Sequence, residues 1–580
     1  MTDLLGFVGG VVPTVLVIGL VIGLVLRSLR RGARRPTAQT GEGHGVRRFF
    51  QYTLLYGLLW VAGAGVAGLL GRLFDLGRTT MQGPGELALF TAFTVVGAPL
   101  YAVVAVWTRR RFVADPRERR SLGWRLYFLA ATLSTLGMTL AALHQVLSWI
   151  VGLTSYDGGA FGSLIVWGGL WLGHWWVDRR LTPADDAVVH RVLAAVLGLV
   201  LVAAGAGSVL ADSFRELLGL GNESVFAGGP DIFLPGAVTL AVGLPVWLLY
   251  WVVPAARYRR GTLWLAYVLL AGVAGGLVTA IASASLVLYD VLVWLVGDPG
   301  TTSADEHFRA LPGALAAVAV GGVVWWYHRA VLQTGGGEER TEVRRVYEYL
   351  MAGIGLVSGA AGLMMMIVSI LQAAAGTGDV ITGGTSALNT VLAAATVLVV
   401  GGPVWWVFWR RIERSARADA AEEHASPTRR IYVFVLFGVA GIAAVVALLV
   451  GVFVVLQDVF AGTVRGETLR SLGYPAGILV ASGLLSAYHW AVYRGDRAYV
   501  RDLQRGPRYV LLIGPRDPEV ATALARVTRG HVDLWPRTDA EDDDPWSLEE
   551  LGERLLTSTA REVVVIVGPG GVSIVPVDRD

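Results

Sequence analysis

Long apolar stretches recur along the chain from Phe7 to Tyr493, separated by short polar segments. A helix needs roughly 20 consecutive apolar residues to cross the hydrocarbon core of a bilayer. The pattern therefore predicts an all-α polytopic membrane protein with about thirteen membrane-spanning helices. The expected spans are Phe7–Val25 and the residues near 49–71, 87–107, 124–151, 161–177, 190–211, 233–253, 262–296, 311–332, 346–374, 388–409, 431–460 and 471–493.

Arginine residues gather in alternate loops between these stretches. The clusters lie at residues 109–111 with 117–120, 179–180, 257–260, 340–345, 410–417 and 494–508. Because positively charged loops stay on the cytosolic side, we expect these loops, and the segment after Arg494, in the cytosol. The first span precedes its own cluster, Arg27 to Arg35, whereas a secretory signal carries its positive charge before the apolar run. We therefore expect a retained first helix in the cell membrane, with the N-terminus outside.

Twelve of the spans pair into six similar hairpins. The first helix of a hairpin starts at an Arg or aromatic cluster, and the second ends in a block of glycine and aromatic residues. The clearest starts are Arg48-Phe-Phe, Arg125-Leu-Tyr, Arg345-Val-Tyr and Arg430-Ile-Tyr. The blocks of odd-numbered hairpins contain Pro99, Pro245 and Pro403, whereas those of even-numbered hairpins carry His174, His328 and His489. The alternation predicts a repeating unit of four helices that is present three times.

The repeat divides the chain into five expected segments. These are an N-terminal helix with a basic linker (1–46), three four-helix membrane repeats (47–180, 181–335 and 336–495) and a small cytosolic domain (506–580). Since each repeat enters and leaves on the Arg-rich side, the copies are parallel and not inverted. Parallel copies fit either a pseudo-threefold ring about the membrane normal or a linear array.

This arrangement resembles a family of uncharacterised prokaryotic multi-pass membrane proteins, defined by the domain of unknown function 5671 with four helices per unit. The Arg and aromatic start and the Gly/Pro-Trp block carry the resemblance, which covers about residues 48–493. The resemblance implies an architecture and no activity.

Composition narrows the class further. Of the 580 residues, 54% are hydrophobic, and the mean hydropathy is +0.57, which places the chain outside the range of soluble globular proteins. The absence of cysteine excludes disulfides and thiolate metal sites. The net charge is only +3, and the arginines lie in short clusters that follow the topology. The expected partner is therefore the lipid bilayer, and no nucleic acid is expected.

The three histidines are the sharpest candidates for chemistry. If the repeats surround one axis, His174, His328 and His489 would offer three equivalent imidazoles to a divalent metal ion. Their ordinary pKa range would also suit proton sensing. The simpler interpretation is a histidine anchored beside a tryptophan in the membrane interface, because no carboxylate recurs next to them. We therefore expect no metal site and no cofactor.

Three further sets of positions recur between the repeats. Gln145, Asp212 and Asp290 each lie seven residues before a glycine at the end of a long helix. They are candidates for an ion or proton path, or for helix caps that water reaches. The three prolines would each free a carbonyl and kink the second helix. The aromatic residues of the blocks predict a belt at the membrane interface, and they are Tyr101, Trp171, Trp247, Trp325, Trp405 and Trp490.

The segment after Arg508 changes in composition. Short β-branched runs at residues 509–513, 563–567 and 572–577 alternate with helix-like stretches, which predicts a compact βαβαββ domain. Asp517-Pro and Asp544-Pro are each expected to start a helix, with Asp as the N-cap. The loop at Gly514 lacks the glycine spacing of a nucleotide-binding loop.

No motif specifies a reaction, so no catalytic residue is assigned. The hypothesis that fits best is a non-enzymatic membrane scaffold or signalling component, whose C-terminal domain docks a cytosolic protein. The alternative is a channel or transporter for an ion or small solute, formed between the three repeats and lined by Asp212, Asp290 and the histidines.

Overall fold

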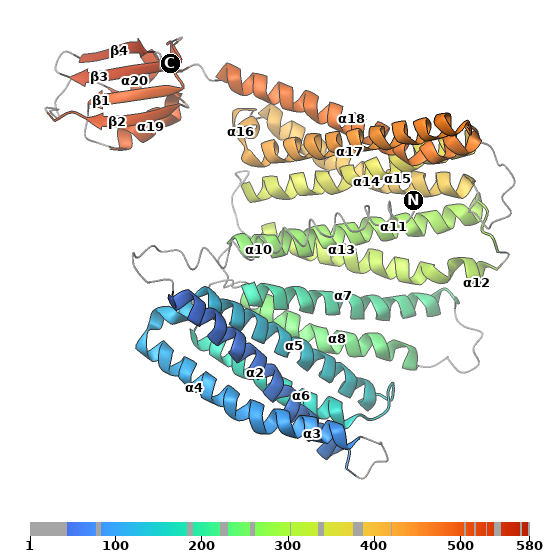
Figure 1. Cartoon of the computed structure of the whole chain (residues 1–580). Coiled ribbons are helices and arrows are strands. Elements are labelled where there is room, and N and C mark those ends of the chain that lie inside the picture. Colours follow the sequence, from blue (N-terminus) through green and yellow to red (C-terminus); the bar gives the residue numbers. More distant parts are fainter. Residues whose placement is uncertain are drawn as a thin grey trace. The chain divides into compact units, whose positions relative to one another are not determined.

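The computed structural model of the protein describes residues 43–76, 83–181, 189–220, 230–255, 261–301, 303–333, 342–374, 387–418, 420–503, 506–514, 518–528, 530–538, 547–558, 560–568 and 571–577. The predicted first span, Phe7–Val25, lies outside these residues. The chain divides into two compact units, Met1–Glu338 and Glu339–Asp580, and each is a stack of long helices with, in the second unit, a small sheet (Figure 1).

The first unit holds two sets of four membrane helices, which we call repeats 1 and 2. Repeat 1 consists of α2 (Gly43–Phe74), the second helix formed by α3 (Pro84–Ala92), the π turn η1 (Phe93–Gly97) and α4 (Ala98–Ala114), then α5 (Leu122–Ile150) and α6 (Gly158–Leu181). Repeat 2 consists of α7 (Val189–Leu217), then α8 (Leu234–Trp247) with η4 (Leu248–Val252) and α9 (Val253–Ala255), then α10 (Thr262–Ala266) with η5 (Tyr267–Ala274) and α11 (Gly275–Leu295), and finally α12 (Ala304–His307) with η6 (Phe308–Ala310) and α13 (Leu311–Gln333).

The second unit holds repeat 3 and the C-terminal domain. Repeat 3 consists of α14 (Glu342–Ala374), α15 (Ala387–Ala418), the short α16 (Ala420–Ala425), α17 (Pro427–Ala461) and α18 (Gly466–Leu503).

Capping residues mark where individual helices start and end. At the start of α5, Ser121 Oγ accepts a hydrogen bond from the Trp124 backbone nitrogen (3.3 Å). At the end of α17, Gly462 adopts the left-handed conformation, with a φ of +65°.

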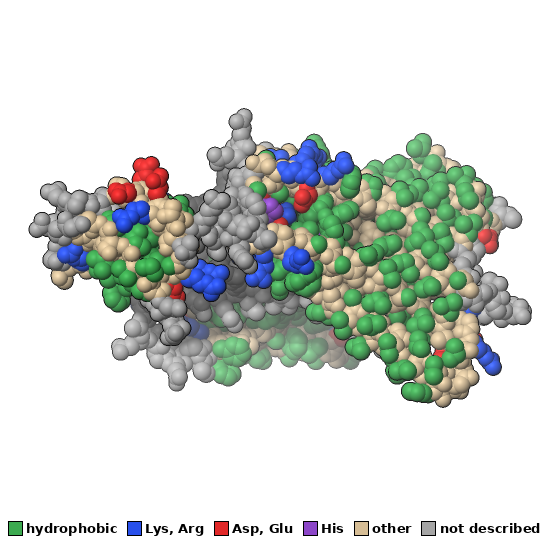
Figure 2. Space-filling model, turned by 90° about the horizontal axis from the view of Figure 1, so that it is seen from above, with side chains coloured by type: hydrophobic (Ala, Val, Ile, Leu, Met, Phe, Trp, Pro, Cys, Tyr) green, Lys and Arg blue, Asp and Glu red, His purple; other side chains and the backbone are tan. Residues whose placement is uncertain are grey.

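Eleven helices of the described residues are long and apolar enough to cross a membrane. A further long helix, α6, has 24 residues but falls outside this set, because its many glycine and tryptophan residues lower its hydropathy. The expectation of about thirteen spans is thus supported for eleven of them. Hydrophobic side chains cover the sides of the helices (Figure 2), and on α17 both Ile442 and Phe453 are largely exposed. Such a surface requires lipid as its solvent, so the chain is a membrane protein.

The helices pack in the same way in all three repeats. The first helix lies against the second and the fourth, and the third lies against the fourth. A Cβ atom on Gly65 of α2 would lie 2.7 Å from the Thr94 backbone nitrogen of the second helix. The corresponding pairs are Gly205 with Leu240 and Gly362 with Leu398, at 2.4 and 2.7 Å. These glycines let the backbones of the first two helices touch.

The reverse contact repeats as well. A Cβ atom on Gly97 of the second helix would lie 2.8 Å from Val61 Cγ1, four residues before Gly65. In repeats 2 and 3, a Cβ atom on Gly243 would lie 2.5 Å from Leu201 Cβ, and one on Gly401 would lie 2.5 Å from Ser358 Cβ. The three repeats therefore share one register between their first and second helices.

The C-terminal domain is a four-stranded sheet with two helices. Its elements are β1 (Tyr509–Gly514), α19 (Pro518–Thr528), β2 (His531–Pro536), α20 (Leu548–Leu556), β3 (Glu562–Gly568) and β4 (Gly571–Val577), in the strand order β2-β1-β3-β4. β1 pairs parallel with β2 and β3, and β4 returns antiparallel to β3. The core between sheet and helices contains Val510, Leu512, Leu524, Leu551, Leu555, Val563, Val565 and Val567.

The predicted helix start at Asp544-Pro lies outside the described residues. Within them, α20 begins at Leu548, because Ser547 caps it by accepting a hydrogen bond from the Glu550 backbone nitrogen (3.1 Å). Serine three residues before glutamate is the stronger helix start.

Candidate functional site

The three histidines lie inside their own repeats, each on the fourth helix. The exposed fraction is 9% for His174 and 0% for His328 and His489. In each ring Nδ1 lies 2.8 or 2.9 Å from the carbonyl oxygen four residues earlier. Because a carbonyl oxygen can only accept, Nδ1 carries the proton of the neutral ring, and Nε2 remains an acceptor. The helix itself therefore sets the same tautomer in all three repeats.

A tyrosine of the third helix faces each histidine. The ring centroids of Tyr127 and His174 are 6.1 Å apart, and Tyr127 Oη lies 3.3 Å from His174 Nε2. The corresponding pairs are Tyr267 with His328 and Tyr432 with His489, at 5.5 and 5.9 Å. Two of these tyrosines end the Arg125-Leu-Tyr and Arg430-Ile-Tyr starts, which was the available sequence signal. A contact between the third and fourth helices is not visible in a local pattern.

Repeats 2 and 3 add a tryptophan of the second helix to this pair. The rings of Trp251 and Trp409 lie 6.1 Å from those of His328 and His489, respectively. Among the described residues, neither His328 Nε2 nor His489 Nε2 has a hydrogen-bond partner. Both Nε2 atoms are therefore buried acceptors that face aromatic rings.

Each histidine thus meets aromatic residues of its own repeat. Within the first unit, His174 packs against Tyr127 and Phe128 of α5, whereas His328 packs against η4, η5 and α8. The described residues contain no group of three or more His, Asp or Glu side chains that could hold a metal ion. The geometry of these sites supports proton acceptance at Nε2 or close packing.

A second recurring site was not predicted from the sequence. In repeat 1, the carboxylate of Glu118 is almost fully buried and accepts hydrogen bonds from Arg47 (3.1 Å) and Arg48 (2.9 Å), with Tyr52 Oη at 3.4 Å. Glu118 lies in η2 (Pro116–Arg120), the turn between the second and third helices. Burial alone would raise the pKa of Glu118, but the hydrogen bonds and charges of Arg48 and Arg47 outweigh burial and hold that pKa below its ordinary value.

Repeat 3 contains the same site. Glu423, in the short helix α16 between the second and third helices, accepts hydrogen bonds from Arg345 Nε (3.1 Å) and from Tyr349 Oη (2.8 Å). Both glutamates lie three residues before the N-cap serine of the third helix, Ser121 or Ser426. The Glu-x-x-Ser spacing before a helix was the signal that could have found the pair.

Another buried charge pair joins repeats 1 and 2. Asp178 of α6 accepts a hydrogen bond from Arg191 Nε of α7 (2.7 Å), and His190 Nε2 lies 3.2 Å from its other oxygen. Further contacts at this junction are Trp171 Nε1 donating to Tyr250 Oη (3.0 Å) and His144 Nε2 lying 3.3 Å from Thr239 Oγ1. Repeats 1 and 2 are therefore joined by a buried charge pair and by further polar contacts between their helices.

The predicted polar positions near the opposite helix ends do not share one environment. Gln145 is exposed and lines a cavity of about 320 Å³ with Trp149 and Asp157. Asp212 pairs with Arg215 of its own helix, and the backbone oxygen of Asp290 lies 2.8 Å from His307 Nε2. The structure does not bring these three side chains together.

The three prolines occupy two kinds of helix. The π turn η1 ends two residues before Pro99, and the π turn η4 begins three residues after Pro245. Pro403 lies within the continuous helix α15. A π turn changes the hydrogen-bond ladder and is a recognised place for a helix to bend, so the second helix is irregular in repeats 1 and 2.

The predicted interfacial aromatic residues also make contacts within the protein. Trp247 Nε1 donates a hydrogen bond to Tyr267 Oη (2.9 Å). The ring of Trp405 contacts that of Tyr488, and the ring of Trp490 contacts that of Tyr493. Tyr101 packs against the buried hydrophobic residues around Tyr127. The Arg329 guanidinium lies 5.3 Å from the ring centroid of Trp325. Guanidinium groups thus stack on tryptophans one turn before them, at the Arg-rich ends of the helices.

Comparison with known proteins identifies the repeat. The model of the domain of unknown function 5671 (DUF5671) matches three segments, residues 48–169, 188–323 and 345–484, which together cover more than half of the chain. Each segment ends five residues before one of the three histidines, so the matches share the helix register described above. No curated protein and no solved structure matches the chain.

The register shows where repeat 2 differs. The matches begin at Arg48, Val188 and Arg345, and four residues later stand Tyr52, Val192 and Tyr349. Three residues before Gly261, the N-cap of the third helix in repeat 2, stands Tyr258 in place of the glutamate. Repeat 2 therefore has none of the three residues of the Arg, Tyr and Glu site at the corresponding positions.

Proposed function

Because the chain belongs to the family defined by the domain of unknown function 5671, which it carries three times, we propose that it is a non-enzymatic membrane scaffold or signalling component. In this proposal, the repeats anchor the chain in the cell membrane, and the C-terminal domain docks a cytosolic protein. The N-terminus lies outside, and the Arg-rich helix ends face the cytosol.

The observation that carries this proposal is the second face of the C-terminal sheet. Helices α19 and α20 pack on one face, which bears Val510 and Val565 (Figure 1). Side chains alternate along a strand, so the neighbours of these residues point to the other face. There, Ile513 is paired in register with Trp535 of β2 and with Ile566 of β3.

Two of these three side chains are exposed to solvent. Trp535 is 60% exposed and Ile566 is 40% exposed, and Val575 of β4 adds a further 43% exposed side chain on the same face. A row of exposed apolar side chains on a rigid sheet is typical of a surface that binds another protein. The proposed partner therefore presents an apolar patch to this row.

The membrane repeats support an anchoring role. The buried charges of Glu118, Asp178 and Glu423 are paired with arginines near the Arg-rich helix ends. Away from the Arg-rich ends, the described helices pack on one another through the glycine contacts and through the aromatic residues around the histidines. Close packing of this kind gives a rigid platform.

Site-specific crosslinking in the full-length chain tests the docking proposal. A photoreactive amino acid at position 535, in native membranes, should give one discrete protein adduct, which the substitution Ile566→Glu should weaken. The matched control is the same amino acid at Glu553, which is exposed on α20. Identical adducts from both positions, or none from position 535, would contradict docking on this face.

The alternative function is a channel or transporter for an ion or small solute. The unpartnered Nε2 atoms of His328 and His489 favour it, because they are buried proton acceptors in membrane helices. Ion flux into proteoliposomes should be measured for the wild type and for a variant with His174, His328 and His489 replaced by Gln. Flux that depends on the histidines would replace the scaffold proposal, whereas flux equal to that of protein-free vesicles would remove the alternative.

A further inference from the structure

Repeat 3 contains an apolar groove on its membrane-spanning surface. The groove has a volume of about 440 Å³ and lies between α14, α15 and α18. Its floor and walls include Gly355, Gly359, Gly402, Trp405, Trp406 and Tyr488, together with alanines and leucines. All three helices belong to candidate membrane spans, so the groove opens at a depth where the surroundings are hydrocarbon.

Two of the glycines are not explained by helix packing. A Cβ atom on Gly355 would lie 2.4 Å from the Trp405 backbone nitrogen, so Gly355 is needed for close contact between α14 and α15. A Cβ atom on Gly402, in contrast, would meet no atom within 4 Å, and one on Gly359 would lie an ordinary 3.9 Å from Gly402 Cα. At these two positions the absence of a side chain leaves space open.

Repeat 2 shows how the space is filled elsewhere. The contact of Gly198 with the Trp247 backbone nitrogen (2.7 Å) corresponds to that of Gly355 with Trp405 and sets the register. In that register Val202 takes the place of Gly359, and Leu244 takes the place of Gly402. Repeat 2 therefore carries two large side chains at the positions where the groove of repeat 3 is open.

A cation lies next to the groove. Trp406 lines the groove and is half exposed, and the Arg410 guanidinium lies 4.1 Å from the centroid of its ring. Arg410 is exposed at the Arg-rich end of α15. The groove is apolar within the membrane span and has an exposed guanidinium at one end. This arrangement matches an anionic phospholipid, whose acyl chain lies in the hydrocarbon and whose phosphate lies at the interface.

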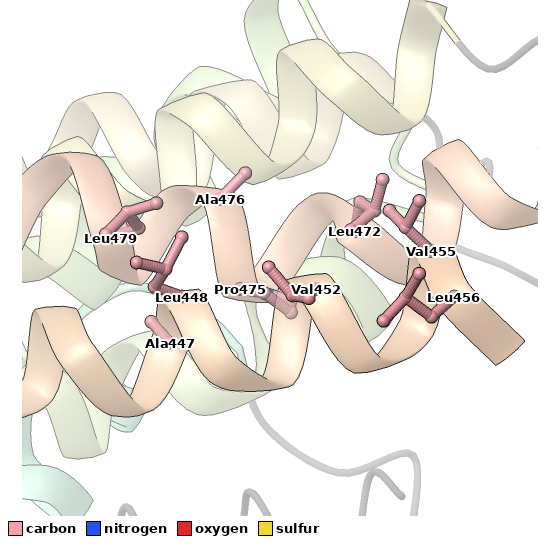
Figure 3. Close-up of a pocket in the computed structure, with 10 residues that line it drawn as sticks. Ala447, Leu448, Val452, Val455, Leu456, Leu472, Pro475, Ala476 and Leu479 are labelled. Atoms are coloured by element: carbon pink, nitrogen blue, oxygen red, sulfur yellow. The ribbon is translucent and has the colours of Figure 1, made fainter.

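A second apolar cavity of repeat 3 provides a comparison. It has a volume of about 300 Å³ and lies between α17 and α18 (Figure 3). All ten residues that line it are apolar, among them Val452, Pro475 and Leu479. Neither lining contains a charged residue. The groove between α14, α15 and α18 differs because the Arg410 guanidinium stacks on one of its lining residues, Trp406, and so gives a bound lipid headgroup a basis for selectivity.

We propose that the groove of α14, α15 and α18 binds one acyl chain of an anionic phospholipid, whose phosphate contacts Arg410. The acyl chain occupies the space beside Gly359 and Gly402, and the rings of Trp405 and Trp406 border the acyl chain near the lipid headgroup. Bound lipid would make repeat 3 sensitive to the anionic content of the membrane.

Photolabelling of the full-length protein in phosphatidylcholine nanodiscs tests the proposal. The probe is phosphatidylglycerol with a photoreactive group in one acyl chain, and the reference probe is the same group on phosphatidylcholine. We expect labelling of α14 and α15 peptides, stronger with the anionic probe. Gly402→Leu, which copies repeat 2, should reduce this labelling about tenfold, as expected for excluding roughly two buried CH₂ groups.

Three variants complete the test. Gly438→Leu on α17, where a Cβ atom also meets nothing within 4 Å, is the matched control and should leave labelling unchanged. Arg410→Gln should keep the labelled peptides but abolish the preference for the anionic probe. If Gly402→Leu does not fold, as judged by its thermal unfolding, Gly359→Val replaces it, because that position also has room.

Equal labelling of wild type and the groove-filling variants would overturn the proposal. Crosslinks from α15 to a second copy of the chain, in place of lipid, would also overturn it, by assigning the groove to a protein contact. If free glycerol 3-phosphate competed equally well in the wild type and in the groove variants, the lipid would bind through its headgroup alone, which would also overturn the proposed acyl-chain site. Loss of labelling in Gly402→Leu with retention in Gly438→Leu supports binding of an acyl chain in the groove. This result does not depend on the outcome for the docking face of the C-terminal domain.

Discussion

The hydroxyl group of Tyr349 donates a hydrogen bond to the carboxylate of Glu423 over 2.8 Å. Tyr52 and Glu118 form the same pair in repeat 1, and repeat 2 has neither residue at the corresponding positions. The pair ties the start of the first helix to the turn before the third, so it closes the Arg-rich end of a repeat. At the corresponding positions of its first helix, repeat 2 has Val188 and Val192, and the buried charge at this helix start is instead Arg191, which pairs with Asp178.

We expect Glu423→Gln to destabilise the protein by roughly 2 kcal/mol, because it removes the buried charge that pairs with Arg345. The loss is less than that of an isolated pair, since Arg345 keeps its contact with Glu342 at 3.0 Å. Thermal unfolding in detergent measures the effect. Glu86→Gln, which breaks the exposed pair with Arg72, is the control and should cost less than about 1 kcal/mol. Equal effects would show that burial of Glu423 adds nothing.

The pKa of Glu118 in the folded protein lies below the ordinary carboxyl value of 4.5. A lowered folded-state pKa stabilises the protein above the unfolded-state value, and the stabilisation is lost as the pH falls through the folded-state value. The stability difference between wild type and Glu118→Gln should therefore be constant above about pH 5.5 and shrink below about pH 4.5. Melting curves of both proteins between neutral and acidic pH measure it. A difference that does not change with pH would contradict the assignment to Glu118.

Two glycines of α7 separate helix contact from helix propensity. A Cβ atom on Gly205 would lie 2.4 Å from the Leu240 backbone nitrogen, whereas one on Gly207 would meet nothing within 4 Å. Gly205→Ala should cost roughly 2 kcal/mol by forcing α7 and α8 apart. Gly207→Ala should be neutral, or stabilising by up to about 1 kcal/mol, because alanine favours a helix. Thermal unfolding of both variants decides, and a neutral Gly205→Ala would argue against the shared contact of first and second helices.

The close approach of η5 to α13 depends on Gly272. A Cβ atom there would lie 2.2 Å from His328 Cγ, so Gly272→Ala must displace the imidazole. In a double-mutant cycle with His328→Ala, we expect a coupling of at least about 1 kcal/mol, with the double variant less destabilised than the sum of the single variants. Thermal unfolding of the four proteins gives the coupling. Additive effects would mean that the histidine does not occupy this space.

The membrane class and the threefold repeat were predictable from the sequence. Hydropathy over a window as long as a span is a local property, and the bilayer leaves a span little choice other than a helix. The match of three DUF5671 segments confirms the family and its repetition. Span length is less certain from composition, because a glycine-rich and tryptophan-rich helix such as α6 has the length of a span without the hydropathy.

The contacts that define the candidate sites could not be read in the same way. Glu118 lies about seventy residues after Arg48, and Glu423 a similar distance after Arg345, so each pair forms only once the second helix has turned the chain back on itself. Likewise, His328 reaches its aromatic neighbours because Gly272 brings two helices together.

Sequence by itself thus determined what depends on neighbours along the chain: helical spans, their Arg-rich ends, and a four-helix unit present three times. Tertiary structure alone decided which side chains meet across helices. It separated glycines that bring backbones into contact, such as Gly355, from those that leave a groove open, such as Gly402. The physical reason is that a missing side chain has the same local signature in both cases, and only the facing helix shows whether the space is filled.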